Sequence, residues 1–154
     1  MQQEENFARK FLDEEQIQTL NSLLYLLLPP SDDGKMPSAS DVGFLSYAHH
    51  KALFPSLTGG LRRINEKSLD QFGQCFSKLG NSDQFQLIEK LKRELFEFFH
   101  LLKSQIINCY YQNSCVLEAI GLDARPPFPS GNSLEQGDLT LLEPVYNRGR
   151  IYRA

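Results

Sequence analysis

The stretch "FEFFHLLKSQIINCYY", residues 96–111, decides the fold class. At 100° per residue on a helix, most of its polar side chains share one narrow strip, and the remaining arc is mainly apolar and is interrupted by Lys103. An arc this wide predicts a central helix that contacts neighbours on two sides. The polar strip consists of Glu97, His100, Ser104, Asn108 and Tyr111.

The rest of the chain is compatible with one soluble domain around this helix. It has 154 residues, of which 41% are hydrophobic and 23% charged, and its net charge is −3 without any block of like charge. A nucleic-acid binder normally shows a basic face, so this class is disfavoured. No strand pattern competes with the helical one.

A first helix is predicted to begin after Asp13 and to end near Leu28. Asp13 is a suitable N-cap, and Gln16 three residues later can complete a capping box. Apolar side chains recur at helical spacing and predict one buried stripe. These are Ile17, Leu20, Leu23, Leu24, Leu27 and Leu28.

Three more helices are predicted before residue 96. One runs from Ser40 or Asp41 to Phe54 and carries Val42, Leu45 and His49 on one face. The next spans about 58–79, with possible breaks at Gly73 and Gly80 and an inward set of Leu61, Ile64, Asn65, Leu69, Phe72 and Phe76. The last is capped by Asn81 or Ser82 and ends near Arg93, with Phe85, Ile88 and Leu91 buried. It either continues into residues 96–111 or kinks away from them.

From Gly121 onward the sequence is rich in proline and glycine and has no sustained period. The predicted fold is therefore an all-α, single-domain bundle of about five helices over residues 1–121. An extended proline-rich C-terminal arm, residues 122–154, packs on this domain or on a partner. A disordered end is the alternative.

The end of this arm combines apolar, tyrosine and arginine side chains. Tyrosine and arginine are enriched at protein–protein interfaces because each offers a broad contact area and directional hydrogen bonds. The predicted partner-binding residues are Leu142, Pro144, Tyr146, Arg148, Arg150, Tyr152 and Arg153.

Glu97 and His100, one helical turn apart, suggest a metal-dependent helical-bundle enzyme as an alternative. A di-iron bundle needs a second Glu-x-x-His turn and two further glutamates. The residues three before His49 and His50 are Ser46 and Tyr47, so the second turn is missing. We therefore predict no metal ligands and interpret Glu97 and His100 as a polar surface or partner-facing strip.

Catalytic motifs are missing from the sequence. It contains no Gly-x-Ser-x-Gly elbow, no Gly-x-Gly-x-x-Gly and no phosphate loop. "TGG" at residues 58–60 could bind an anion if it began a helix, although simple capping is the favoured interpretation. The three cysteines are interpreted as thiols that are buried or have no chemical role. A disulfide between Cys109 and Cys115 is the alternative. We expect no catalytic and no cofactor-binding residue in this chain.

Targeting signals are also missing from the sequence as written. The apolar run "LLYLLLPP", residues 23–30, is too short to span a bilayer, and no secretory signal is recognisable at the start. Arg62 and Arg63 are internal, so they do not form a twin-arginine export signal. The expected location is cytoplasmic, or periplasmic if such a signal has been removed.

Four stretches together resemble the gluconate 2-dehydrogenase subunit 3 family. They are "FLDEEQIQTLNSLLYLLLPPSDDG" (11–34), "GLRRINEKSLDQFGQCFSKL" (60–79), "FFHLLKSQIINCYY" (98–111) before a short "IG", and "LLEPVYNRGRIYR" (141–153). The resemblance implies a small accessory subunit that assists folding, stability or export of a large flavoprotein of the glucose–methanol–choline type.

In that family the large subunit carries the FAD and oxidises a sugar or sugar acid, and electrons commonly pass to a cytochrome c subunit. The resemblance thus implies that this chain brings no cofactor of its own. Direct insertion into the membrane is not expected, because the apolar run of residues 23–30 is too short. An unrelated helical adaptor is a further alternative, and it would have a partner without flavin.

Overall fold

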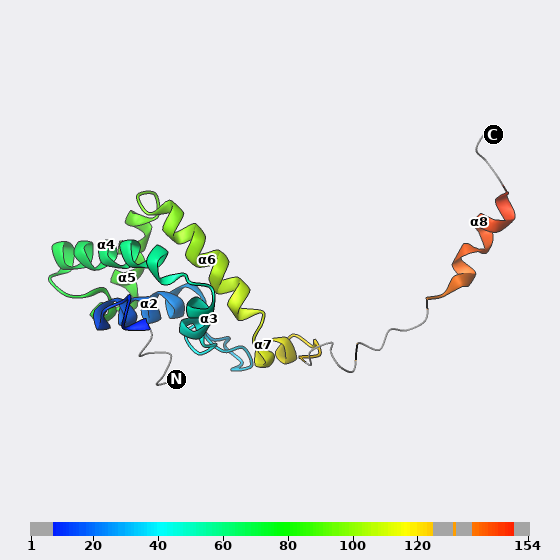
Figure 1. The fold of residues 1–154 in the computed structure, drawn as a ribbon, viewed down its shortest axis with the longest axis horizontal. Helices are drawn as coiled ribbons and strands as arrows, with labels where there is room; N and C mark the ends of the chain where they lie inside the picture. Colours follow the sequence, from blue (N-terminus) through cyan, green and yellow to red (C-terminus); the bar gives the residue numbers. More distant parts are fainter. Residues whose placement is uncertain (1–7, 125–130, 132–136, 150–154) are drawn as a thin grey trace. The chain divides into compact units, whose positions relative to one another are not determined.

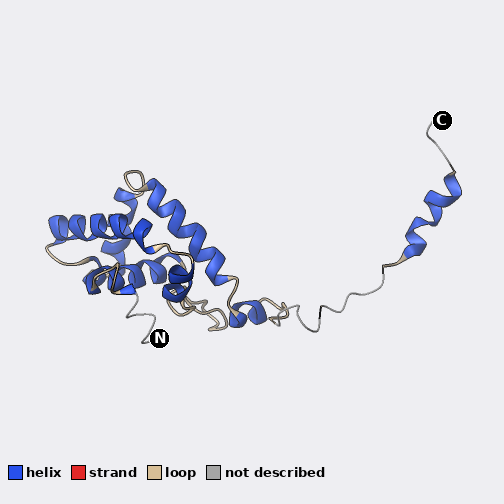
Figure 2. Cartoon of the chain, viewed as in Figure 1, coloured by secondary structure: helices blue, strands red, loops and turns tan. Residues whose placement is uncertain are grey.

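The computed structural model describes residues 8–124, 131 and 137–149, and these residues form an all-α fold without strands (Figures 1 and 2). By its contacts the chain divides into two units, 1–124 and 125–154. The helices of the first unit are α2 (Glu14–Leu27), α3 (Phe44–His50), α4 (Phe54–Phe72), η1 (Phe76–Lys78), α5 (Asn81–Leu91), α6 (Phe96–Tyr110) and α7 (Ser114–Ala119).

Helix α2 begins where its sequence predicts. The Asp13 carboxylate accepts a hydrogen bond from the Gln16 backbone N–H at 2.7 Å, and the Gln16 side chain accepts one from the Asp13 N–H at 3.1 Å. This reciprocal capping box satisfies two amide groups that would otherwise lack a partner at the helix start. The predicted stripe is buried from Ile17 to Leu24, whereas Leu27 is partly exposed.

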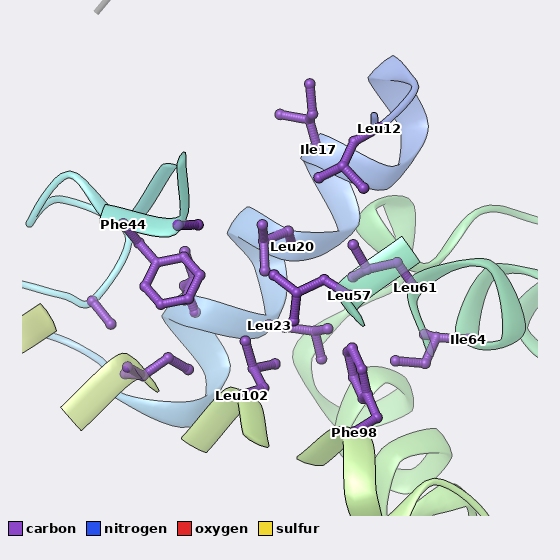
Figure 3. Close-up of a cluster of buried hydrophobic side chains, with 14 of the residues drawn as sticks. Leu12, Ile17, Leu20, Leu23, Phe44, Leu57, Leu61, Ile64, Phe98 and Leu102 are labelled. Atoms are coloured by element: carbon purple, nitrogen blue, oxygen red, sulfur yellow. The ribbon is translucent and has the colours of Figure 1, made fainter. Parts of the chain in front are cut away.

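The core lies between α2, α4 and α6. Helix α2 packs against α4 and η1, and α6 packs against α3 and α4, so the two-sided contact predicted for residues 96–111 is confirmed. Figure 3 shows side chains from these helices converging on one cluster. They include Leu20 and Leu23 of α2, Leu57, Leu61 and Ile64 of α4, and Phe98 and Leu102 of α6.

The region between residues 40 and 58 differs from the prediction. Helix α3 is only seven residues long, because Ala52 adopts a φ of 52° and interrupts the helix. Its fully buried residues are Phe44 and Ala48. Of the predicted face, Val42 and Leu45 are partly buried and pack against the core, and His49 is half-buried. Helix α4 begins at Phe54 rather than at Thr58, since Pro55 occupies an early helical position where its missing N–H costs nothing.

Helix α4 ends earlier than the predicted 58–79 span. Gly73 closes it in the left-handed conformation, which confirms the break expected there. Phe76 is buried, but it reaches the core from η1 rather than from α4. Leu69, expected to face inward, is exposed.

Helix α5 begins after Gly80 and not after an Asn81 or Ser82 cap. Its buried side chains are Gln84, Leu87, Ile88 and Leu91, whereas Phe85, predicted to be buried, is 59% exposed. A turn at residues 92–95 separates α5 from α6, so the chain kinks away here.

The described part of the second unit is helical. A 3₁₀ turn, η2 (Leu139–Leu142), leads directly into α8 (Glu143–Arg148). The Asp138 carboxylate starts η2 by accepting hydrogen bonds from the Thr140 hydroxyl at 2.6 Å and backbone N–H at 3.0 Å, and these bonds lower the pKa of Asp138. Within the predicted C-terminal arm, residues 139–148 are therefore helical. Pro144 falls in the first turn of α8, where proline is compatible with a helix.

Candidate functional site

Glu97 and His100 lie on the exposed side of α6, as the polar strip predicts. The His100 ring lies beside that of Phe96, with ring centroids 5.9 Å apart. Within residues 8–124, 131 and 137–149, no group of three or more His, Cys, Asp or Glu side chains is placed to hold a metal ion. Nothing in the described geometry therefore favours the metal-enzyme alternative.

Two other candidates from the sequence have clear positions. His49 is half-buried and His50 is exposed, with ring centroids 5.5 Å apart. The "TGG" of residues 58–60 lies inside α4 and not at its start, so its amides cannot form a helix-start anion site. The Thr58 hydroxyl instead donates to the Phe54 carbonyl oxygen at 2.8 Å.

A groove of about 640 Å³ lies where α2, α5 and α6 meet, and we term it the α6 groove. Its floor is apolar and is formed by Leu27, Ile88, Phe96 and Phe99. Phe96 is 60% exposed, so the floor is open to solvent. The groove could not be predicted from the sequence, because the residues that line it come from three separate helices.

Cationic side chains surround this floor. Lys92, Arg93 and Lys103 contribute positive charge, His100 lies among them, and no carboxylate belongs to the lining. Lys92 pairs with Glu89, whereas Arg93 and Lys103 have no ion-pair partner among the described residues. An apolar floor with a basic rim is suited to binding a group that is both apolar and acidic.

The groove continues along α6 toward its C-terminus. A second cavity of about 330 Å³ shares His100 and Lys103 with the first and is further lined by Ser104, Ile107 and Asn108. From Phe96 to Asn108 the helix advances about 18 Å at ~1.5 Å per residue. Three residues of the predicted polar strip, His100, Ser104 and Asn108, therefore line one open surface.

Outside the groove, partly buried polar groups hold α6 in place. The Tyr110 hydroxyl donates to the Pro37 carbonyl oxygen at 2.8 Å, and the Tyr47 hydroxyl donates to Gln105 Oε1 at 2.8 Å. Burial raises the pKa of Tyr110, with a smaller contribution from Tyr111, so the phenol keeps its proton. These bonds anchor α6 to the loop before α3 and to α3 itself.

The predicted partner-binding residues of the arm are exposed where the structure describes them. Leu142, Pro144, Tyr146 and Arg148 all belong to η2 or α8, and Tyr146 is 75% exposed. Arg150, Tyr152 and Arg153 lie outside the described residues. Further exposed apolar side chains on this segment are Leu139, Leu141 and Val145.

The three cysteines form no disulfide with one another. All three are free thiols in the structure: Cys109 is buried, Cys75 is half-buried and Cys115 is exposed. Burial raises the pKa of Cys109, which disfavours the reactive thiolate.

The described residues thus define a small all-α protein that exposes apolar side chains in the α6 groove and on the η2–α8 segment. No helix in the described part of the chain is long and apolar enough to cross a bilayer. A family model described as gluconate 2-dehydrogenase subunit 3 matches residues 14–122. Comparisons with curated proteins and with solved structures gave no significant match.

The matched region covers α2 to α7, which is most of the first unit and more than half of the chain. The chain therefore belongs to the gluconate 2-dehydrogenase subunit 3 family, and the resemblance found in the sequence is confirmed. Its general role is that of a subunit of a gluconate 2-dehydrogenase type of complex.

Proposed function

We propose that the chain is the non-catalytic accessory subunit of an FAD-dependent dehydrogenase complex that oxidises a sugar or sugar acid. Its partner is a large flavoprotein of the glucose–methanol–choline type, which holds the FAD and the catalytic base, and a cytochrome c subunit accepts the electrons. The chain supports folding, stability or export of the flavoprotein and holds no cofactor itself.

One observation carries the partner-binding part of this proposal: the apolar side chains of η2 and α8 are exposed. Leu142, Val145 and Tyr146 follow the i, i+3, i+4 spacing that places side chains on one face of a helix. Side chains of this kind on a short helix are typical anchors for a groove on another protein. Arg148, at the end of the same helix, adds a directional hydrogen-bonding group.

Co-expression with a large flavoprotein of this type tests the proposal. With an affinity tag on the flavoprotein, we expect the wild-type chain to co-purify and to raise the yield of flavin-loaded partner. Tyr146→Ala and deletion of residues 125–154 should weaken co-purification. Tyr25→Ala serves as a matched control, because Tyr25 is also an exposed tyrosine but lies on α2.

Two results would contradict the proposal in different ways. If the wild-type chain does not associate with the flavoprotein, the accessory role is wrong, and a helical adaptor with a partner that lacks flavin becomes the better hypothesis. If the wild type associates and the arm variants behave like Tyr25→Ala, the role stands and the arm is not the contact.

A further inference from the structure

We infer that the α6 groove is a second docking surface, and that it binds an acidic amphipathic helix of the large flavoprotein subunit. This inference rests on the proposed function, since it takes the flavoprotein as the partner. It adds a contact on the helical domain that is separate in sequence from the η2–α8 segment.

Charge favours an acidic occupant. The lining carries three cations and a histidine without any carboxylate, although the chain as a whole has a net charge of −3. A concentration of positive charge on an otherwise acidic chain selects a partner segment of opposite sign and disfavours a second copy of this chain. Arg93 and Lys103 have no described ion-pair partner, so each can pair with a carboxylate without losing an existing ion pair.

The floor favours an amphipathic occupant. Phe96 and Phe99 are one helical turn apart on α6, with Leu27 and Ile88 completing the apolar surface from α2 and α5. Exposed Phe96 leaves a large apolar area in contact with water, and covering it with apolar side chains is favourable. The basic side chains around it would meet acidic residues that flank the apolar face of the partner.

The shape favours a helix over a small molecule. The two adjoining cavities extend about 18 Å along α6, roughly three helical turns. They are open along this length, whereas a site for a small amphiphile typically encloses most of its ligand. A channel beside a helix, with anchors one turn apart, matches the mode in which an amphipathic helix binds a groove.

Two pairs of substitutions in the co-expressed complex test the inference. Phe96→Ala removes the exposed ring from the floor, and Phe85→Ala is its matched control, because Phe85 is equally exposed and does not line the groove. Arg93→Glu with Lys103→Glu reverses the charge of the rim. Arg62→Glu with Lys51→Glu makes the same change at exposed positions outside it.

We expect each groove variant to weaken the complex at least about tenfold, as truncation of a buried interface anchor does, and each control to remain within about twofold of the wild type. Thermal unfolding of the isolated variants verifies that they fold. A photoreactive phenylalanine analogue at position 96 in the full complex gives an independent readout. It should cross-link to an acidic helix of the flavoprotein.

The opposite results separate this inference from the proposed function. If the wild type co-purifies but groove and control variants bind equally well, the groove is not a docking surface, although the accessory role stands. Cross-linking only to a bound lipid or fatty acid would also overturn the inference. Failure of the wild type itself to co-purify overturns both.

Discussion

The phenyl ring of Phe98 in α6 lies against the backbone of Gly60 in α4, so that a Cβ atom at position 60 would come within 2.1 Å of the ring. The ring therefore occupies the space that any side chain at position 60 would need. Phe98 is itself buried, so it cannot turn out of the way into solvent. This glycine is required for the close approach of α4 and α6.

Gly60→Ala is accordingly expected to destabilise the fold. Overpacking a core costs about 1–3 kcal/mol, whereas replacing glycine by alanine within a helix stabilises by about 1 kcal/mol. The free energy of unfolding should thus fall by up to about 2 kcal/mol, measured by chemical denaturation.

The neighbouring glycine provides the control for this prediction. Gly59 is in the same helix, but a Cβ there would meet nothing within 4 Å. Gly59→Ala should therefore raise the free energy of unfolding by up to about 1 kcal/mol. If both variants shift stability in the same direction by the same amount, the contact of Phe98 with Gly60 does not limit the packing.

A second prediction concerns the buried hydrogen bond between α2 and α4. The Thr19 hydroxyl donates to Asn65 Oδ1 at 2.7 Å, and both residues are buried. Asn65→Ala leaves the hydroxyl without its acceptor, so we expect a loss of about 1–3 kcal/mol in the free energy of unfolding. Equilibrium denaturation of the single and double variants measures it.

Thr19→Val with Asn65→Ala is the informative comparison. Since both partners are then removed, the loss should be smaller than the sum of the two single losses. Strict additivity would show that the two side chains do not depend on each other.

Local signals in the sequence predicted the helices well, whereas burial was predicted poorly at single positions. The capping box of Asp13 and Gln16 and the break at Gly73 depend on residues close in sequence, so they can be identified without the fold. Phe85 and Leu69 have the spacing of buried residues but are exposed. Helical spacing identifies an apolar face but does not show whether another element covers it.

The candidate surfaces differ in the same way. The η2–α8 segment was predicted as a binding surface because its tyrosine and arginine content is visible in the sequence. The α6 groove was not predicted, because Leu27, Ile88 and Phe96 come together only when α2, α5 and α6 pack. From the sequence, Phe96 belongs to the apolar arc of its helix and is expected to be buried. The fold leaves its ring exposed on the floor of the groove.

The start of α2 gives a third prediction. Asp13→Ala removes the acceptor for the Gln16 N–H, and loss of an N-cap of this kind costs about 1 kcal/mol in the free energy of unfolding. Asp13→Asn retains a side-chain oxygen and should stay close to the wild type. Thermal denaturation followed by circular dichroism compares them. Equal destabilisation by both variants would mean that charge, and not the capping hydrogen bond, accounts for the effect.

The thiols give a fourth prediction, which depends on pH. Cys115 is exposed and should react quickly with Ellman's reagent in the folded chain, whereas buried Cys109 should react only after unfolding. Because burial raises the pKa of Cys109, the folded chain keeps this thiol protonated at a pH where the unfolded chain has lost the proton. Its contribution to stability is therefore complete below the unfolded pKa of about 8.5 and decreases as the pH rises above it.

Two variants separate these effects. Cys115→Ser should abolish the fast reaction with Ellman's reagent and leave the dependence of stability on pH unchanged. Cys109→Ala should retain the fast reaction. Between about pH 8 and 10, its free energy of unfolding should fall less than that of the wild type, because this range begins just below the unfolded pKa of about 8.5. A fast reaction that persists in Cys115→Ser would show that another thiol, such as half-buried Cys75, is accessible in the folded chain.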